Sequence, residues 1–308
     1  MKRYYWLLGF GLILTLVWMV NWQTGVFSHA TKKAARVVYT MAILDPQMAK
    51  IAKLNKNVPY CNSSDPQQRL DLYTPKNATA APYPLVVYIH GGGWHGGDKT
   101  GSLLGYYAPS LVKQGIAVAA VNYRLAPRAI YPAQNDDVAC ALSWLRQNAG
   151  TYHLDPARLA LFGDSAGGEL VTYATVADRY QTTPWRRSLK GVVDFYGIAD
   201  LTGFTPGGHL DKITHAYLGS GYTQNLKAAS PLSYRPAQTP PFLIVHGTND
   251  RDVPIAQSQA LANHLMVSGS VTFVPVANSG HGFTFRSQPS ADQIRTQVVA
   301  FIHQTLAQ

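Results

Sequence analysis

The stretch that decides the fold is LALFGDSAGGEL, residues 159–170, in which an apolar run ends in a serine between glycines. Residues 163–167 fit the pattern G-x-S-x-G, where a strand turns abruptly into a helix. Such a turn holds its serine in a strained, exposed conformation and is too tight for larger flanking side chains. Glycine and serine also form ordinary turns, so the motif alone leaves both interpretations open. If the turn is a nucleophile elbow, the chain must also supply a base, an acid and an oxyanion hole.

Short apolar runs alternate with helical stretches along the chain after Tyr60. The predicted strands are Leu70–Tyr73, Leu85–His90, Ala117–Tyr123, Leu159–Phe162, Val192–Tyr196, Phe242–His246 and Val271–Val276. The predicted helices are Gln134–Asn148, Ala166–Tyr180, Ile255–Ser268 and Ile294–Leu306. Apolar runs separated by helices are typical of an α/β fold with a mostly parallel sheet covered on both faces. Ligand sites in such sheets form at the carboxyl ends of the strands, where Ser165 is expected.

The glycine loop, residues 90–94 (HGGGW), directly follows the predicted strand that ends in LVVYI. Three glycines let the backbone approach a ligand closely and aim N–H groups at one point. An ester carbonyl gains negative charge on its oxygen during attack, and preorganised donors stabilise that charge. We therefore predict an oxyanion hole formed by the backbone N–H groups of Gly92, Gly93 and Ala166. A flexible turn is the simpler alternative.

The base is expected on a loop after the last strand, and His281 in ANSGHGF lies there between two glycines. The acid is expected after the preceding strand, where HGTNDRDVP offers Asp250 and Asp252. Asp250 is favoured because it comes first after the strand, and His246 is interpreted as structural. The acid would hold the tautomer of the histidine and stabilise its imidazolium form. The chain order Ser165, Asp250, His281 is that of the α/β-hydrolases.

Seven motifs together resemble the hormone-sensitive-lipase and feruloyl-esterase-like branch of the α/β-hydrolases. They are HGGGW, VNYRLAP, YPAQNDDV, GDSAGG, SPLS, HGxxDxxVP and GHGF, spread over roughly residues 65–305. The resemblance implies an α/β-hydrolase fold and a serine carboxylesterase that acts on a small-molecule ester without cofactor or metal. Arg124, Asp136 and Asp137 match motif positions that we interpret as structural. Asp252 departs from the usual pattern by adding a second carboxylate beside the acid.

Three other functions remain open from the residues alone. The same serine, histidine and aspartate could cleave an amide or a peptide, although no propeller or other large gating domain is evident. The acyl group could also pass to a bound nucleophile other than water, which would make the protein an acyltransferase. A non-catalytic, membrane-tethered binding module is a third alternative, but such degenerate members usually lose one of the three residues.

The substrate pocket is less well defined by the sequence. Residues Gly203–Pro236 form a longer connection than two strands need, so we predict a small lid-like insertion. Candidate wall residues are Trp94, Phe204 and Phe283, with Tyr106, Tyr107 and Tyr217 as further aromatic candidates. Acetyl, short aliphatic, feruloyl and peptidoglycan-linked esters are all compatible. The glycine-rich elbow and the lack of a long lid favour short acyl chains.

The net charge of +10 does not indicate a nucleic-acid-binding protein. Residues 1–60 carry eight Lys and Arg against one Asp, or +7, which leaves only +3 for the other 248 residues. This basic region lies beside an apolar N-terminal segment, a pattern that fits a membrane surface or an anionic cell envelope.

The apolar segment itself runs from Tyr4 to Trp22 without a charged residue, after Lys2 and Arg3. As a helix it would extend about 28 Å, close to the thickness of the hydrocarbon core of a bilayer. We expect residues 1–30 to be an uncleaved hydrophobic helix that anchors an extracytoplasmic catalytic domain. A cleaved secretory signal with the small-residue site at 28–30 is the alternative. Residues 31–60 would be a helical linker or cap, and residues 61–308 the hydrolase domain.

The chain has two cysteines, Cys61 and Cys140, and no metal-ligand spacing. A disulfide between them is compatible with the sequence but nothing in it requires one. Because Cys140 falls within an apolar helical pattern, we interpret it as a small buried hydrophobic residue.

Overall fold

Eight strands form one sheet in the computed structural model, which describes residues 45–76, 82–283 and 286–308. The strands lie side by side in the order β1-β2-β4-β3-β5-β6-β7-β8. Their bounds are β1 (Ala52–Pro59), β2 (Arg69–Pro75), β3 (Tyr83–Ile89), β4 (Ala117–Val121), β5 (Leu154–Asp164), β6 (Leu189–Phe195), β7 (Phe242–Gly247) and β8 (Val271–Val276). The pairs β1–β2 and β2–β4 are antiparallel, whereas every pair from β4 to β8 is parallel. The expected parallel sheet is therefore present, with an antiparallel edge added.

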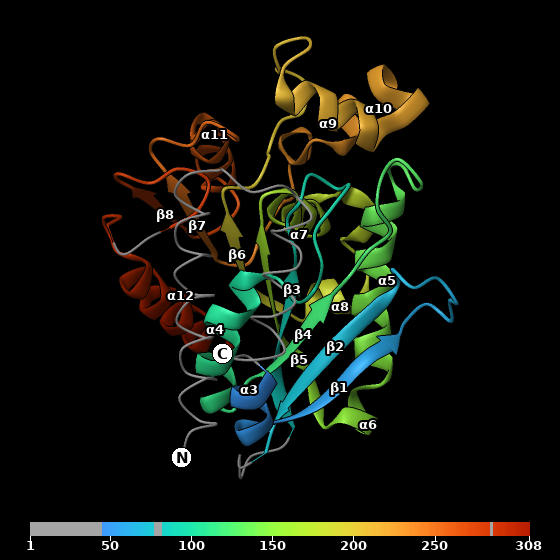
Figure 1. The fold of residues 1–308 in the computed structure, drawn as a ribbon, viewed down its shortest axis with the longest axis vertical. Coiled ribbons are helices and arrows are strands. Elements are labelled where there is room, and N and C mark those ends of the chain that lie inside the picture. The colour runs from blue at the N-terminus through green and yellow to red at the C-terminus, as the bar shows by residue number, and fades with distance from the viewer. Residues whose placement is uncertain (1–44, 77–81, 284–285) are drawn as a thin grey trace, which may run out of the picture.

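Two layers of helices cover the two faces of the sheet (Figure 1). One layer contains α5 (Ala133–Gln147), α6 (Ala149–Tyr152), α7 (Ala166–Val176), α8 (Pro184–Arg187) and α11 (Ala256–Leu265). The other contains α3 (Asp45–Ile51), α4 (Ser102–Lys113) and α12 (Ala291–Leu306). Residues of the central strands alternate between the two hydrophobic clusters beneath these layers, which explains the continuous apolar runs in the sequence.

The insertion expected at residues 203–236 folds into two further helices, α9 (His209–Leu218) and α10 (Tyr222–Ala229), followed by a short 3₁₀ turn, η4 (Pro231–Ser233). Figure 1 shows α9 and α10 beyond one end of the sheet, apart from both layers. Tyr131 holds the insertion to the domain, because its backbone N–H donates to Tyr217 O at 2.8 Å and its hydroxyl to Ala228 O at 3.0 Å.

The N-terminal part of the domain differs from the prediction. Residues 31–60 were expected to be helical, but within the described part helix α3 ends at Ile51 and strand β1 follows. Strand β1 pairs with β2 along its length, so the chain joins the sheet before residue 61. Residues 1–44 lie outside the described residues, so the hydrophobic anchor of residues 1–30 stays a prediction. Among the helices that the structure describes, none has the length and apolar character of a membrane span.

Cys61 and Cys140 form a disulfide, with Cα atoms 5.8 Å apart. Cys140 was interpreted as a small buried hydrophobic residue, whereas it is half-buried and forms the disulfide that the sequence left open. The disulfide ties the connection between β1 and β2 to the middle of α5. Both residues are half-buried and pack against the cluster beneath α5 and α7, so their sulfur atoms also contribute apolar contacts.

The three charged residues interpreted as structural all form ion pairs. Arg124 donates from its guanidinium to both carboxylate oxygens of the buried Asp137, at 2.7–3.0 Å. Asp137 also accepts from Gln68 at 2.6 Å, which connects α5 to the start of β2. Asp136 forms an exposed pair with Arg179 on the outer face of α5.

Candidate active site

Ser165 lies in the turn between β5 and α7, with φ 55° and ψ −120°. The glycines on either side are required by close backbone contacts. A Cβ on Gly163 would lie 2.2 Å from Gly167 O, and one on Gly167 would lie 2.1 Å from Ile89 O. Both distances are far below a normal van der Waals contact, so only glycine fits. The sequence motif thus forms the strained strand-to-helix turn that its residue types predict.

A chain of two hydrogen bonds joins three residues that are far apart in the sequence. His281 Nε2 lies 3.0 Å from Ser165 Oγ, and His281 Nδ1 lies 2.7 Å from Asp250 Oδ2. Ser165 follows β5, Asp250 follows β7 and His281 follows β8, so parallel strands bring all three to the same edge of the sheet. This arrangement can pass a proton from the hydroxyl to the imidazole and stabilise the resulting imidazolium.

The carboxylate of Asp250 is fully buried and surrounded by donors. Its Oδ1 accepts the backbone N–H groups of Asp252 and Val253, both at 2.9 Å, and its Oδ2 lies 3.3 Å from His246 Nε2. Burial alone would raise the pKa of Asp250, but hydrogen bonds from His246 and His281 together hold it below its usual range. Asp250 is therefore ionised at neutral pH and can stabilise positive charge on His281.

Asp252 is exposed and makes no hydrogen bond to His281 among the described contacts. One ligand-type atom each of Asp250, Asp252 and His281 lies within 4.8 Å of the others. This is the only such group among the residues that the structure describes. Two of its three members are already hydrogen-bonded to each other, so the geometry favours proton transfer over metal binding.

The glycine loop packs directly against Ser165. Gly91 N–H donates to Asp164 Oδ1 at 3.1 Å, and a Cβ on Gly91 would lie 3.1 Å from Ser165 Cβ. Gly92 and Gly93 follow with φ values of 122° and 59°, a conformation that favours glycine. Ala166 is the first residue of α7, whose N-terminus carries unpaired backbone N–H groups. The three predicted oxyanion-hole residues therefore lie on the two backbone segments that flank the serine.

The predicted pocket aromatics lie in different environments. Trp94 is fully buried and stacks on Tyr217, with ring centroids 4.3 Å apart, so both rings belong to the core rather than to a pocket wall. Phe204 is half-buried at the start of the insertion. Phe283 is half-buried two residues beyond His281, with its ring 5.1 Å from that of Phe195.

The two tyrosines of α4 contact residues of the sheet and of α12. Tyr107 is buried between Phe162 and Phe195, with ring centroids 5.2 and 5.6 Å away. Tyr106 donates its hydroxyl to Asp292 on α12 at 2.8 Å. Both contacts lie on the layer of α4 and α12, where these side chains stabilise the packing of the helices.

Two residues near the site were not predicted. Tyr196 directly follows β6 with φ 41°, and its ring centroid lies 4.4 Å from that of His281. Ile213 on α9 lies over the glycine loop, because its Cδ1 would be 3.3 Å from a Cβ on Gly93. The insertion therefore reaches the predicted oxyanion hole. An aromatic residue at the end of a buried strand, such as Tyr196, indicates a site residue only weakly. Nothing in the sequence around Ile213 indicates that it contacts the glycine loop.

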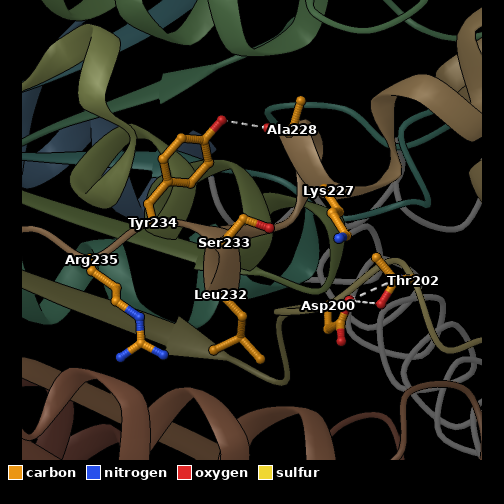
Figure 2. A pocket seen from close by; sticks show the side chains of 8 residues that line it. All are labelled: Asp200, Thr202, Lys227, Ala228, Leu232, Ser233, Tyr234 and Arg235. Atoms are coloured by element: carbon orange, nitrogen blue, oxygen red, sulfur yellow. Dashed lines mark hydrogen bonds between the residues drawn. The ribbon is translucent and has the colours of Figure 1, made fainter.

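An open depression of about 570 Å³ lies between the second half of the insertion and the loop that precedes the insertion (Figure 2). It is lined by Asp200, Thr202, Lys227, Ala228, Leu232, Ser233, Tyr234 and Arg235. None of the three hydrogen-bonded residues is part of this lining, so the depression is not the site of the serine itself. The loop that carries Asp200 is fixed by Gln257, whose Oε1 accepts the N–H groups of Ala199 and Asp200 at 2.9 and 2.8 Å.

Comparison with known proteins identifies the family of the chain. A family model described as BD-FAE matches residues 70–265. Esterase LipQ of Mycobacterium tuberculosis is 28% identical over 299 residues, which cover 92% of this chain and 68% of LipQ. Esterase LipC of the same organism is 30% identical over 249 residues, or 75% of this chain and 61% of LipC.

Among solved structures, a truncated form of a carbohydrate esterase from gut microbiota is similar, with a TM-score of 0.73 and 26% sequence identity. The match covers 84% of this chain and 98% of that one. The chain belongs to the BD-FAE family, has the α/β-hydrolase fold and is an ester hydrolase.

Proposed function

We propose that the protein is a serine carboxylesterase that cleaves short-chain or carbohydrate-linked acyl esters through an acyl-enzyme. The observation that carries the proposal is the hydrogen-bonded chain from Ser165 Oγ through His281 to the buried carboxylate of Asp250. The same three residue types in the same roles form the hydrolytic triads of unrelated folds.

In the first half-reaction, Ser165 Oγ attacks the ester carbonyl carbon while His281 Nε2 takes the hydroxyl proton. The carbonyl oxygen becomes an oxyanion, and the proposal assigns its stabilisation to the backbone N–H groups of Gly92, Gly93 and Ala166. Each such donor lowers the barrier by about 3–4 kcal/mol. The intermediate collapses, the C–O bond to the alcohol breaks, and the leaving oxygen takes the proton from His281.

In the second half-reaction, water attacks the acyl-enzyme by the same route. His281 takes one proton of the water, the oxyanion forms again, and the bond to Ser165 breaks. The proton returns to the serine oxygen, which releases the carboxylic acid. Asp250 accepts a hydrogen bond from His281 Nδ1 throughout both halves, so Nε2 is the nitrogen that takes and returns the proton.

One comparison supports the substrate class. A structure titled as a carbohydrate esterase is among the similar structures.

We also infer that the catalytic domain works outside the cytoplasm. The Cys61–Cys140 disulfide supports this, because disulfides persist in oxidising compartments. The apolar segment after Lys2 and Arg3 supports it as well, as an anchor or a secretory signal. Fractionation of the cells, followed by thiol alkylation of the recovered protein, tests both points. Recovery in the cytoplasmic fraction with two free thiols would refute the inference.

The test of the activity measures hydrolysis of p-nitrophenyl esters from acetate to palmitate by the full chain, beside Ser165→Ala. Ser220→Ala is a matched control, because Ser220 is an exposed serine of the insertion. We expect highest activity on the short esters, loss of turnover in Ser165→Ala and wild-type rates in the control. Full activity in Ser165→Ala would refute the serine mechanism. Labelling of Ser165 by a phosphonate without turnover of any ester would favour amide substrates or acyl transfer.

A further inference from the structure

Glu169 is the only glutamate in the chain of 308 residues, and it is fully buried. It lies on α7 one turn beyond Ser165, and its backbone N–H donates to Ser165 O at 3.0 Å. Its side chain accepts a hydrogen bond from Trp94 Nε1 at 2.9 Å. Burying a carboxyl group costs free energy that only hydrogen bonds or an ion pair can offset, and the mechanism above does not use this one.

The surroundings of Glu169 favour its uncharged form. Burial raises the pKa of its carboxyl group well above the ordinary value, the hydrogen bond from Trp94 and the nearby Asn135 lower it less, and the nearby Asp194 raises it further. No ion pair within the described residues includes Glu169. Within the described residues, the carboxyl group is thus a hydrogen-bond acceptor for the indole and not a member of an ion pair.

The partner of Glu169 is the residue that ends the glycine loop. Trp94 directly follows Gly93 and has φ 60°, so the position of its indole constrains the backbone of the loop. Its ring lies nearly parallel to that of Tyr217 on α9, at an interplanar angle of 6°, and Trp94 O accepts from Ala126 N–H at 2.9 Å. The indole is thus held on one face by the insertion and at its edge by α7.

We propose that Glu169 is a positioning residue that fixes the glycine loop for catalysis by anchoring the indole of Trp94 between α7 and α9. The inference rests on the proposed function, because it assigns the donors of the oxyanion hole to this loop. The hydrogen bond places both flanks of the hole, the loop and the start of α7, in one rigid unit. Donors that shift away from the developing oxyanion lose transition-state stabilisation but leave ester binding largely unchanged.

The test compares Glu169→Gln, which keeps an acceptor of the same shape, with Glu169→Met, which fills the space without one. For short p-nitrophenyl esters we expect Glu169→Met to lower kcat by about 10- to 100-fold with little change in KM. Glu169→Gln should stay within about threefold of wild type. Thr172→Val is a matched control, because Thr172 is also buried on α7 but bonds Asp194, away from the loop. It should change the melting temperature and not kcat.

A second variant keeps the proposal testable if Glu169→Met does not fold. Trp94→Phe retains a ring that can stack on Tyr217 but loses the N–H donor, so it should reproduce the loss in kcat. Combining the two changes should add little further loss, because both remove the same hydrogen bond.

Three results would overturn the proposal: wild-type kcat in Glu169→Met or in Trp94→Phe, a loss in Glu169→Gln as large as in Glu169→Met, or a change confined to KM. Failure of the proposed function is recognised separately, because Ser165→Ala would then retain activity.

Discussion

Removal of the Cys61–Cys140 disulfide should destabilise the protein markedly. The two residues are 79 positions apart, so the disulfide closes a large loop and restricts the unfolded chain strongly. Chain-entropy reasoning for a loop of this length gives about 4.5 kcal/mol in the free energy of unfolding. For a domain of this size each kcal/mol corresponds to about 2–4 °C, so we expect the melting temperature to fall by roughly 9–18 °C.

The assay is thermal unfolding followed by circular dichroism, on the wild type with and without reductant and on the variant with both Cys61→Ala and Cys140→Ala. Reduction leaves both half-buried sulfur atoms in place, so it separates the effect of the cross-link from that of packing. Reductant should not shift the melting temperature of the double variant. The reasoning fails if reductant leaves the wild-type melting temperature unchanged, or if the native protein shows two free thiols.

Three other predictions follow from the site. Asp250→Asn should lower kcat by about 10⁴-fold, because the amide favours the wrong tautomer of His281. The kcat of Asp252→Asn should stay near that of wild type. Steady-state kinetics in which Asp252→Asn loses more activity than Asp250→Asn would assign the acid to Asp252 instead. Because the pKa of Asp250 is lowered in the folded state, its stabilisation is complete above about pH 4 and is lost as the pH falls further. The free energy of unfolding of wild type should therefore exceed that of Asp250→Asn by an amount that decreases as the pH falls below this value. A difference that stays constant with pH would contradict the assignment. Gly167→Ala should lower the free energy of unfolding by about 3 kcal/mol, because its Cβ would overlap Ile89 O. Gly150→Ala is the control and should be tolerated, because there is open space around Gly150. Equal denaturant midpoints for the two variants would refute this reasoning.

Much of the sheet could be predicted because buried parallel strands are continuous apolar runs. The predicted strand Val271–Val276 coincides with β8, and Leu159–Phe162 lies inside β5. Strand β1 was missed because AKLNKNVP is a polar edge strand whose partner, β2, is the main source of its stability. Helix α4 was missed because Gly105 and Pro109 interrupt its helical pattern.

The hydrogen-bonded chain at the site could be predicted because chain order and strand ends constrain it. The surroundings of Ser165, His281 and Asp250 could not be predicted, because they depend on contacts between residues far apart in the sequence. An aromatic residue in a loop gives no sign of whether it faces solvent or core, and the partner of Trp94 is 75 residues away. Whether Cys61 and Cys140 form a disulfide was likewise undetermined, because two cysteines 79 residues apart in the sequence need not lie close together in the fold.

The stacking of Tyr217 on Trp94 limits how such enzymes can be recombined. Helix α9 belongs to the insertion, the part of the fold that a protein engineer would exchange to obtain a new substrate preference. A graft that replaces residues 203–236 with the insertion of a relative also replaces Tyr217, the ring that stacks on the indole of Trp94. Chimeras that keep a flat aromatic residue at position 217 should therefore retain turnover, and those that lose it should need a compensating change at position 94.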